Sequence, residues 1–310
     1  MSTTVTRGTP ASPTPEATQP HVPLDAAQRG PGPFVWRFNL YHRVTHATMM
    51  VTFFTLAATG LPLRFSRAFW APTVVRLLGG VHNAGLLHRI AAGVTFGYFL
   101  AHIAYVVAAL VRARPSERKR MLWGRESMVP NLDDAVQFLQ QWRWYFGLGP
   151  RPEFGRYSYM EKFDYFAVFW GVAMIGGSGL FLWFPEFFAR FVPGWLFNIA
   201  TVIHADEAVL AASFIFTIHF FNVHLRPEKF PLDAVMFTGR ATKHYMEEEH
   251  AAILDRIEAR AGEPVTEKPV LDAPAPPPSR RQSLAGAVLG FFALAVGLIL
   301  IGMMLWVALS

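Results

Sequence analysis

The sequence predicts an all-α membrane protein in which four transmembrane helices form a bundle and a fifth transmembrane helix follows at the C-terminus. About half of the residues are hydrophobic, whereas only 16% are charged, against roughly one quarter in an ordinary soluble domain. The apolar residues gather in long runs, each close to the roughly 20 residues that a helix needs to cross a bilayer. Lys and Arg cluster beside these runs, as in membrane proteins.

The chain begins with a stretch, residues 1–33, that is rich in Thr, Pro and Ala and has no periodicity, so we expect a disordered tail. Residues 34–250 are expected to form the four-helix membrane domain. Its third apolar segment contains "GGSG" (176–179), whose small residues allow another helix or a cofactor to approach closely. The four apolar segments of this domain cover 40–63, 85–111, 164–184 and 199–224.

The C-terminal part of the chain consists of a polar stretch and one more apolar segment. Residues 251–283 include "EPVTEKPVLDAPAPPPSRR", which predicts a flexible cytoplasmic linker. Residues 284–310 hold the fifth transmembrane helix, which contains no ionisable residue. We therefore interpret this helix as an anchor or a subunit contact, not as a functional site.

Basic residues predict the orientation of the helices. The loop "RARPSERKRMLWGR" (112–125) holds six Lys or Arg, and the loop before the second helix holds Arg64, Arg67 and Arg76. The loop between the third and fourth helices holds only Arg190. The side of the 112–125 loop is thus expected to be cytoplasmic, with the N-terminus inside and the C-terminus outside. The net charge of +6 is explained by this topology, and we expect no nucleic-acid partner.

Histidines are the residues on which any metal chemistry of this chain depends. The chain has no Cys, which excludes disulfides, Cys-ligated iron–sulfur clusters and haem attached through a C-x-x-C-H motif. Seven of the 11 histidines lie on three of the five apolar segments. Ionisable residues are costly inside a membrane helix and are usually functional. These seven are His42 and His46 on the first segment, His88 and His102 on the second, and His204, His219 and His224 on the fourth.

Their spacing predicts two levels of facing imidazoles. His88 and His102 are 14 residues apart, and His204 and His219 are 15 apart, which on a helix is about 21–22 Å. A haem iron bound by two imidazoles between helices of a bundle needs such facing pairs. Both helices start outside, so His88 and His204 form an outer pair. At the inner level His46, His102 and His219 compete for one haem, which needs two of them.

Two further histidines and two arginines lie close to the proposed ligands. His42 and His224 are nearer to the cytoplasm, where they provide either for a third haem or for contact with a haem propionate or a quinone. Arg43 and Arg89 each sit beside a proposed ligand and are suited to bind propionates. Lipid-headgroup binding and topology control explain these two arginines equally well. Three other histidines lie in polar segments and are expected to be solvated: His21, His244 and His250.

Four stretches carry a resemblance to a known family: "RVTHATMMVTFFTLAATGLPL", "HRIAAGVTFGYFLAH", "EKFDYFAVFWG" and "HADEAVLAASFIFTIHFFNVHLRPEKFP". They resemble the membrane b-type cytochrome subunits of periplasmic oxidoreductases, such as the gamma subunit of formate dehydrogenase and the cytochrome b subunits of nickel–iron hydrogenase and thiosulfate reductase. The resemblance covers residues 34–250. It implies two b-type haems, the bacterial inner membrane, and a periplasmic multihaem c-type cytochrome or other catalytic oxidoreductase subunit as the partner.

The family pattern also implies which residues bind the haems. One His from the first helix, one from the second and two from the fourth hold two haems in this family. By the resemblance, His88 and His204 bind the periplasmic haem, whereas His46, within an R-x-x-H pattern, and His219 bind the cytoplasmic one. This chain departs from the family in its 15-residue interval on the fourth helix, where about 14 is usual, and in carrying His102. The partner of His219, either His46 or His102, therefore stays open.

The predicted function is that of a di-haem b-type membrane cytochrome subunit that moves electrons between the quinone pool and a periplasmic redox partner. The quinone is expected close to His219, with Asn222 and Asp164 as polar contacts. Asp206 and Glu207, near the outer haem, are expected at a helix N-terminus, where acids are favoured. Two alternatives are a haem-free transporter or proton-relay protein that uses intramembrane histidines, and a structural anchor whose histidines only pack.

Overall fold

The computed structural model describes residues 34–124, 126–226, 229–230, 232–253, 257 and 271–309. The expected N-terminal tail, residues 1–33, lies outside the described residues. The described part is mainly helical, and its elements follow one another in this order: β1 (Phe34–Trp36), α1 (Leu40–Arg64), α2 (Ala71–Leu77), α3 (Val81–Arg112), α4 (Pro115–Trp123), α5 (Leu132–Tyr145), α6 (Tyr159–Gly171), η2 (Val172–Gly176), α7 (Gly177–Trp183), α8 (Pro185–Phe188), α9 (Trp195–Phe214), η3 (Ile215–His219), η4 (Phe221–Leu225), α10 (Val235–Thr238), β2 (Arg240–Thr242), α11 (Lys243–Glu249), η5 (Ala251–Ile253), β3 (Pro274–Ala275) and α13 (Arg280–Leu309).

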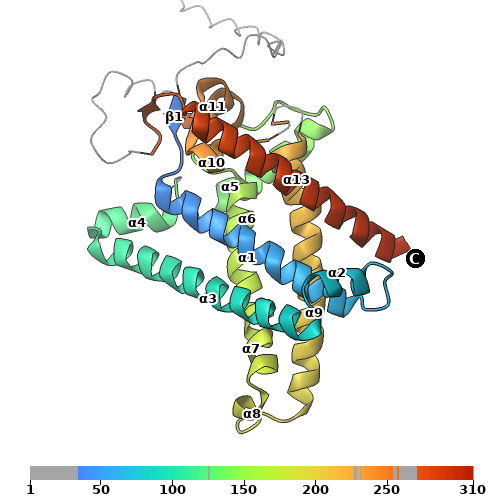
Figure 1. Cartoon of the computed structure of the whole chain (residues 1–310). Helices are drawn as coiled ribbons and strands as arrows, with labels where there is room; N and C mark the ends of the chain where they lie inside the picture. The colour runs from blue at the N-terminus through green and yellow to red at the C-terminus, as the bar shows by residue number, and fades with distance from the viewer. Residues whose placement is uncertain are drawn as a thin grey trace, which may run out of the picture. The chain divides into compact units, whose positions relative to one another are not determined.

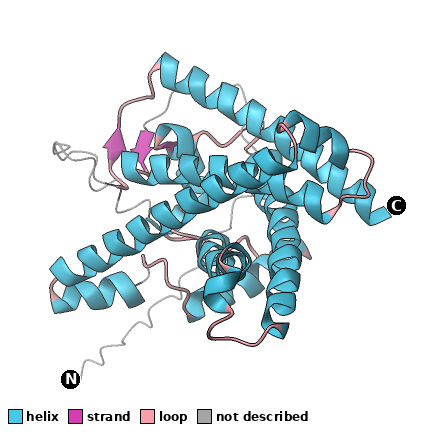
Figure 2. Ribbon diagram, turned by 60° about the horizontal axis from the view of Figure 1, so that its bottom comes forward, coloured by secondary structure: helices cyan, strands magenta, loops and turns pink. Residues whose placement is uncertain are grey.

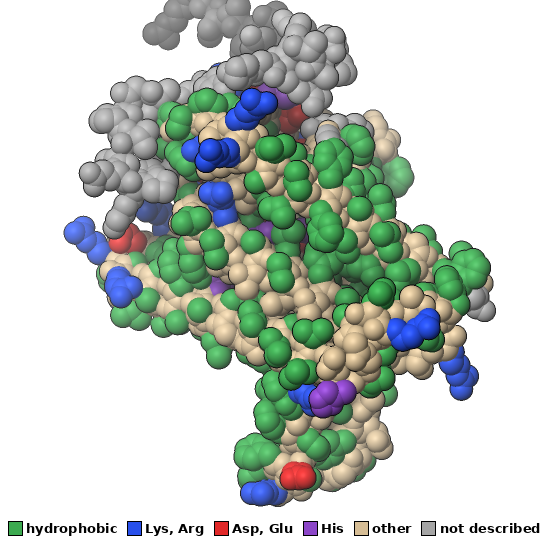
Figure 3. Space-filling model, in the orientation of Figure 1, with side chains coloured by type: hydrophobic (Ala, Val, Ile, Leu, Met, Phe, Trp, Pro, Cys, Tyr) green, Lys and Arg blue, Asp and Glu red, His purple; other side chains and the backbone are tan. Residues whose placement is uncertain are grey.

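Five helical stretches of the described residues are long and apolar enough to cross a membrane, which agrees with the prediction of an all-α, multi-pass membrane protein. Many large apolar side chains on them are exposed, and hydrophobic side chains cover much of the face in Figure 3. Such a surface suits lipid and would be a liability in water. The five stretches are Leu40–Arg64, Val81–Arg112, Tyr159–Trp183, Trp195–Leu225 and Arg280–Trp306.

Local residues set where the spans begin, and the second, third and fourth spans begin before the expected apolar runs. The side chain of Asn39 accepts a hydrogen bond from the amide of His42 and starts α1. Ser158 and Glu161 form a capping box at the start of α6, five residues before the expected start of that span. Gly80, with a φ of 94°, turns the chain into α3.

The helices pack as two pairs with a fifth helix beside them. Figures 1 and 2 show α1 and α3 side by side, and α7 beside α9. The C-terminal α13 packs on η3 and α10. A buried apolar cluster joins these parts and includes Phe216 and Phe220 from the fourth span and Ala293 and Leu294 from α13. The fifth span thus contributes to the core of the described helices.

Strand β1, which comes just before the first span, forms a small antiparallel sheet with β2 and β3. The sheet has the strand order β2-β1-β3, with Val35 of β1 opposite Ala241 of β2 and Pro274 of β3. Part of the expected linker 251–283 therefore has regular structure, namely η5, β3 and the first residues of α13, whereas 254–256 and 258–270 lie outside the described residues. Strands of two or three residues carry too little alternation to be predicted.

A buried network of charges holds this sheet to the helices. Arg37, 1% exposed, donates hydrogen bonds to Asp272 at 3.0 Å and to the carbonyl of Arg156 at 2.6 Å. Asp272 also accepts a hydrogen bond from the Arg156 side chain. Burial opposes the charged form of Arg37, yet the carboxylates of Glu161 and Asp272 raise its pKa overall. Arg37 and Arg156 each have a carboxylate partner, which offsets part of the cost of burying their charges.

His250 belongs to this network, which corrects the expectation that it is solvated. Its side chain is buried, its Nδ1 lies 2.7 Å from the Gly155 carbonyl, and its Nε2 lies 3.2 Å from Nη2 of Arg37. The guanidinium donates to Nε2, so Nδ1 carries the proton that is donated to Gly155. Burial lowers the pKa of His250, so the ring is neutral here.

We expect Asp272→Asn to destabilise the sheet by about 3 kcal/mol, because Arg37 would keep its burial and lose its closest carboxylate. Amide hydrogen exchange of peptides that contain Val35 and Ala241 should become faster. The exposed Asp133→Asn removes the same charge and should leave this exchange unchanged. Equal exchange rates in the wild type and Asp272→Asn would contradict the role of this pair.

Candidate functional site: intramembrane histidines

The two histidines predicted to form the outer pair lie next to each other in the structure. His88 comes from α3 and His204 from α9, and their ring centres are 6.1 Å apart with an angle of 69° between the planes. The longer helices place the two residues deeper than expected, since α3 begins at Val81 and α9 at Trp195. The rise of about 1.5 Å per residue puts both roughly 10–14 Å from the starts of their helices.

Hydrogen bonds assign the tautomer of both rings. Nδ1 of His88 lies 2.8 Å from the hydroxyl of Thr59, which itself donates to the carbonyl of Thr55 at 2.7 Å. The Thr59 oxygen therefore accepts from Nδ1–H. Nδ1 of His204 donates to the carbonyl of Ile175 at 2.9 Å. In each ring the lone pair is left on Nε2, which is the arrangement found in metal-binding histidines.

The outer pair fits a metal ion that binds one imidazole on each side. With each nitrogen about 2 Å from such an ion, the ring centres would be roughly 6 Å apart, as they are here. Glycines leave room beside both rings. A Cβ at Gly179 would lie 3.0 Å from Cε1 of His204, and one at Gly60 would lie 3.4 Å from Cε1 of His88. The "GGSG" motif thus serves a close approach between helix and histidine.

No group of three or more His, Asp or Glu suited to holding a metal ion exists among the described residues. A metal held only by protein side chains usually requires three or four such ligands. Two imidazoles suffice where a macrocycle supplies the other donors.

The inner histidines form a second group. His46 lies within electrostatic range of His219 and His224. Nδ1 of His219 lies 2.9 Å from Oδ2 of Asp164, which orients the ring and leaves Nε2 available. Buried polar atoms gather here without a hydrogen-bond partner among the described residues: Nδ1 of His42, Nδ1 of His224 and Oδ1 of Asp164. Unpaired buried polar atoms are rare, so this end of the bundle is suited to a bound group.

Short π-helical segments interrupt the third and fourth spans, and the sequence did not predict them. Along an α-helix, 15 residues end about 60° beyond a whole number of turns, whereas 14 residues end about 40° short of one. A π turn absorbs roughly one residue. Because η3 lies between His204 and His219, the 15-residue interval becomes equivalent to one of 14. Similarly, η4 brings His224 onto the side of His219, five residues before it.

His102 has both ring nitrogens engaged by tyrosines. Nδ1 lies 3.2 Å from the hydroxyl of Tyr41, and Nε2 lies 2.9 Å from that of Tyr165. The ring also stacks with Tyr41 and with Tyr105. The structure therefore gives His102 a hydrogen-bonding role and leaves His46 as the freer neighbour of His219.

The predicted propionate-binding arginines differ in their surroundings. The guanidinium of Arg43 donates a hydrogen bond to the carbonyl of Phe237, just before the end of α10. Arg89 is exposed and has no hydrogen-bond or ion-pair partner among the described residues. Arg89 is thus the freer of the two to bind an anion.

The acids near the outer pair do not lie at a helix N-terminus, and that expectation was wrong. Asp206 and Glu207 are in the middle of α9, because this helix begins at Trp195. Asp206 forms an ion pair with Arg64 at 2.9 Å, and Glu207 accepts a hydrogen bond from Trp170 at 3.3 Å. Both acids are therefore explained by contacts between helices.

No family model matches the chain. No curated protein matches its sequence.

We expect Thr59→Val to change the tautomer of His88, because valine cannot accept the proton of Nδ1. The imidazole ¹⁵N signals of His88 should then report a mixture of tautomers, at a cost in stability of about 1–3 kcal/mol for the unpaired N–H. Thr59→Ser retains the hydroxyl and should preserve the wild-type signals. Identical spectra for the valine variant and the wild type would argue against this hydrogen bond.

Proposed function

We propose that the chain is a di-haem b-type membrane cytochrome subunit that exchanges electrons between the quinone pool and a periplasmic redox partner. The observation that carries the proposal is the outer pair, in which the ring centres of His88 and His204 are 6.1 Å apart. Nδ1 of each ring is hydrogen-bonded to a neighbouring helix. A haem held by two imidazoles supplies one-electron transfer without binding a substrate at the iron.

The residues divide between two haems. His88 and His204 would hold the outer haem, and His46 and His219 the inner one, since the ring nitrogens of His102 are engaged by tyrosines. Thr59, the Ile175 carbonyl and Asp164 orient these ligands. The remaining candidates would have supporting roles at the haem edges. Arg89 would bind a propionate, and so would Arg43, which is already hydrogen-bonded to α10. His42 and His224 would be inner contacts or ligands of a third haem.

The quinone would bind beside the inner haem. A quinone exchanges protons together with electrons, so its site needs groups that bind a proton or donate a hydrogen bond. Asp164 has one carboxylate oxygen on His219 and another that is buried without a partner among the described residues. Asn222 donates its amide N–H to the Ile218 carbonyl, which leaves its side-chain oxygen to accept a hydrogen bond. Activity toward quinol would make this subunit part of an enzyme.

The membrane and the partner follow from charge and resemblance. The basic loop 112–125 supports a cytoplasmic position for that end of α3. The outer pair then lies toward the periplasm of a bacterial inner membrane, with the N-terminus cytoplasmic and the C-terminus periplasmic. A multihaem c-type cytochrome or another catalytic oxidoreductase subunit would exchange electrons there. Residues 34–250 would form the cytochrome domain, and α13 an added anchor.

A second candidate function is a haem-free proton relay through the membrane. His102 between Tyr41 and Tyr165 forms a hydrogen-bonded chain in which a proton entering at one nitrogen can leave at the other. The pair of His219 and Asp164 is a second proton-binding group. We rank this function lower because it gives no reason for the ring centres of the outer pair to be 6.1 Å apart.

We expect the purified protein to show a b-type reduced-minus-oxidised spectrum with two haems per chain by pyridine haemochrome. His88→Ala and His204→Ala should each lose about half of the haem, because one axial imidazole does not hold the group. His82→Ala removes an exposed histidine from the same helix and should keep both haems. A folded protein without any b-type band would exclude the proposed function.

The two candidate functions differ in proton flux. In liposomes, the proton-relay function predicts passive proton flux that Tyr165→Phe suppresses, since phenylalanine breaks the hydrogen-bonded chain. The cytochrome function predicts no such flux in the haem-containing protein, and it predicts that His102→Gln retains both haems. Phe166→Leu, on the same helix and without a hydroxyl, serves as the control. Flux that depends on Tyr165 would favour the relay.

A further inference from the structure

The basic helix α4 is held at the membrane surface by its connection to the second span. α3 ends at Arg112 and α4 begins at Pro115, so only Ala113 and Arg114 lie between them. Three chain steps extend at most about 11 Å. Whatever the tilt of α3, α4 therefore lies in or next to the headgroup region.

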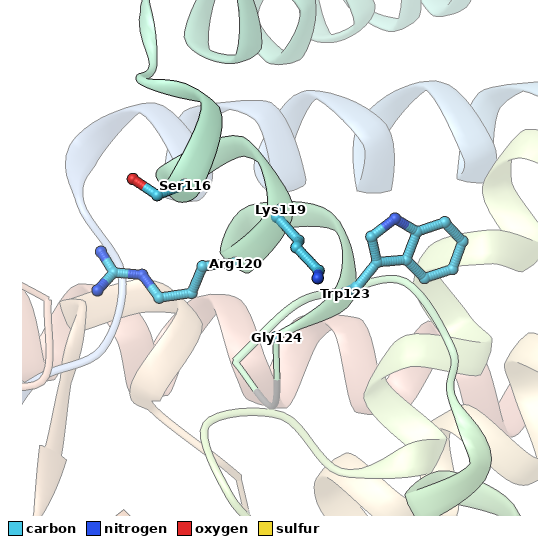
Figure 4. Close-up of a pocket in the computed structure, with 5 residues that line it drawn as sticks. All are labelled: Ser116, Lys119, Arg120, Trp123 and Gly124. Carbon is cyan, nitrogen blue, oxygen red and sulfur yellow. The ribbon is translucent and has the colours of Figure 1, made fainter.

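One face of α4 carries a hollow that no part of the proposed function uses. Its volume is about 290 Å³, and all of its lining residues belong to α4 and its C-cap (Figure 4). Their spacing of three and four residues places them on one side of the helix. The indole of Trp123 is 68% exposed. The lining residues are Ser116, Lys119, Arg120, Trp123 and Gly124.

The charges of this hollow are not compensated. Residues 112–120 contain five Lys or Arg and one acid, Glu117. Glu117 accepts a hydrogen bond from the Arg114 amide at the helix start, and Arg118 donates to carbonyls at the end of α3. The side chains of Lys119 and Arg120 have no hydrogen-bond or ion-pair partner among the described residues. Two free cations thus line an exposed hollow at the membrane surface.

The backbone around the hollow is set by local contacts. The hydroxyl of Ser127, which is 3% exposed, donates to the Leu122 carbonyl at 2.9 Å and holds the chain after α4 against the helix. A Cβ at Gly124 would overlap the carbonyl oxygen of Arg120, so this position does not accept a side chain. The backbone at the C-terminal end of α4 is therefore held by these local contacts.

We propose that this hollow binds the phosphate headgroup of an anionic phospholipid. Lys119 and Arg120 would neutralise the phosphate, and the Ser116 hydroxyl would donate a hydrogen bond to it. Trp123 would lie at the level of the headgroups, where indole rings are favoured. A lipid fits better than free phosphate because the exposed indole matches the acyl–headgroup boundary and because α4 cannot leave the membrane surface.

The test measures lipid binding by the full-length protein in neutral phosphatidylcholine nanodiscs. Phosphatidylglycerol is titrated in, and retained lipid is counted by native mass spectrometry. The double substitution Lys119→Gln/Arg120→Gln should weaken binding about thirtyfold, since each basic residue near the surface contributes about fivefold. The control Arg280→Gln/Arg281→Gln removes the same charge from the start of another span and should leave this binding unchanged.

Three outcomes would overturn the proposal. Equal weakening by the two double substitutions would show general surface charge. Unchanged binding in Lys119→Gln/Arg120→Gln would show that the lipid binds elsewhere. Displacement of the lipid by inorganic phosphate at equal concentration would show a site for free anions. Trp123→Ala further distinguishes a lipid headgroup from free phosphate, because it should weaken phosphatidylglycerol binding and leave phosphate binding unaffected. Haem content and circular dichroism confirm that each variant is folded.

Discussion

The structure depends on how imidazole nitrogens are satisfied inside apolar helices. An unpaired polar atom costs several kcal/mol in hydrocarbon, so a hydrogen-bond partner from a neighbouring helix stabilises an intramembrane histidine. His88 uses a threonine hydroxyl, His204 a backbone carbonyl and His219 a carboxylate. In all three histidines the partner is hydrogen-bonded to Nδ1, so Nε2 is not used by this contact. The same hydrogen bonds that satisfy these histidines inside the helices thus leave their Nε2 atoms available.

The π-helical segments give the third and fourth spans a backbone geometry that a regular α-helix does not have. In an α-helix each interior carbonyl accepts a hydrogen bond from the amide four residues later. Ile175 lies in the π-helical η2, and its carbonyl accepts hydrogen bonds from His204 and from the hydroxyl of Ser178. η3 corrects the phase between His204 and His219. The 15-residue interval between these two histidines thus becomes equivalent, in helix phase, to one of 14 residues.

The sequence predicted the parts of the structure that depend on composition and spacing. The five membrane spans follow from long apolar runs, and the proximity of His88 and His204 follows from their depth on two helices. The π turns could not be predicted, because they depend on a balance between packing and backbone bonding that no short pattern encodes. The burial of His250 and the strand at Pro274–Ala275 were missed because both arise from contacts between distant segments. The role of His102 required the positions of Tyr41 and Tyr165 on two other helices.

The buried charged network around Arg37 affects the position of the inner histidines. Arg37 lies three residues before α1, Glu161 lies in the first turn of α6, and Asp272 lies eight residues before α13. Their mutual attraction fixes the ends of three spans relative to one another. Asp164 follows Glu161 by three residues, so it shares that helix face and is held at a defined height beside His219. The buried charges beside the ends of the spans therefore also help to position Asp164 next to His219.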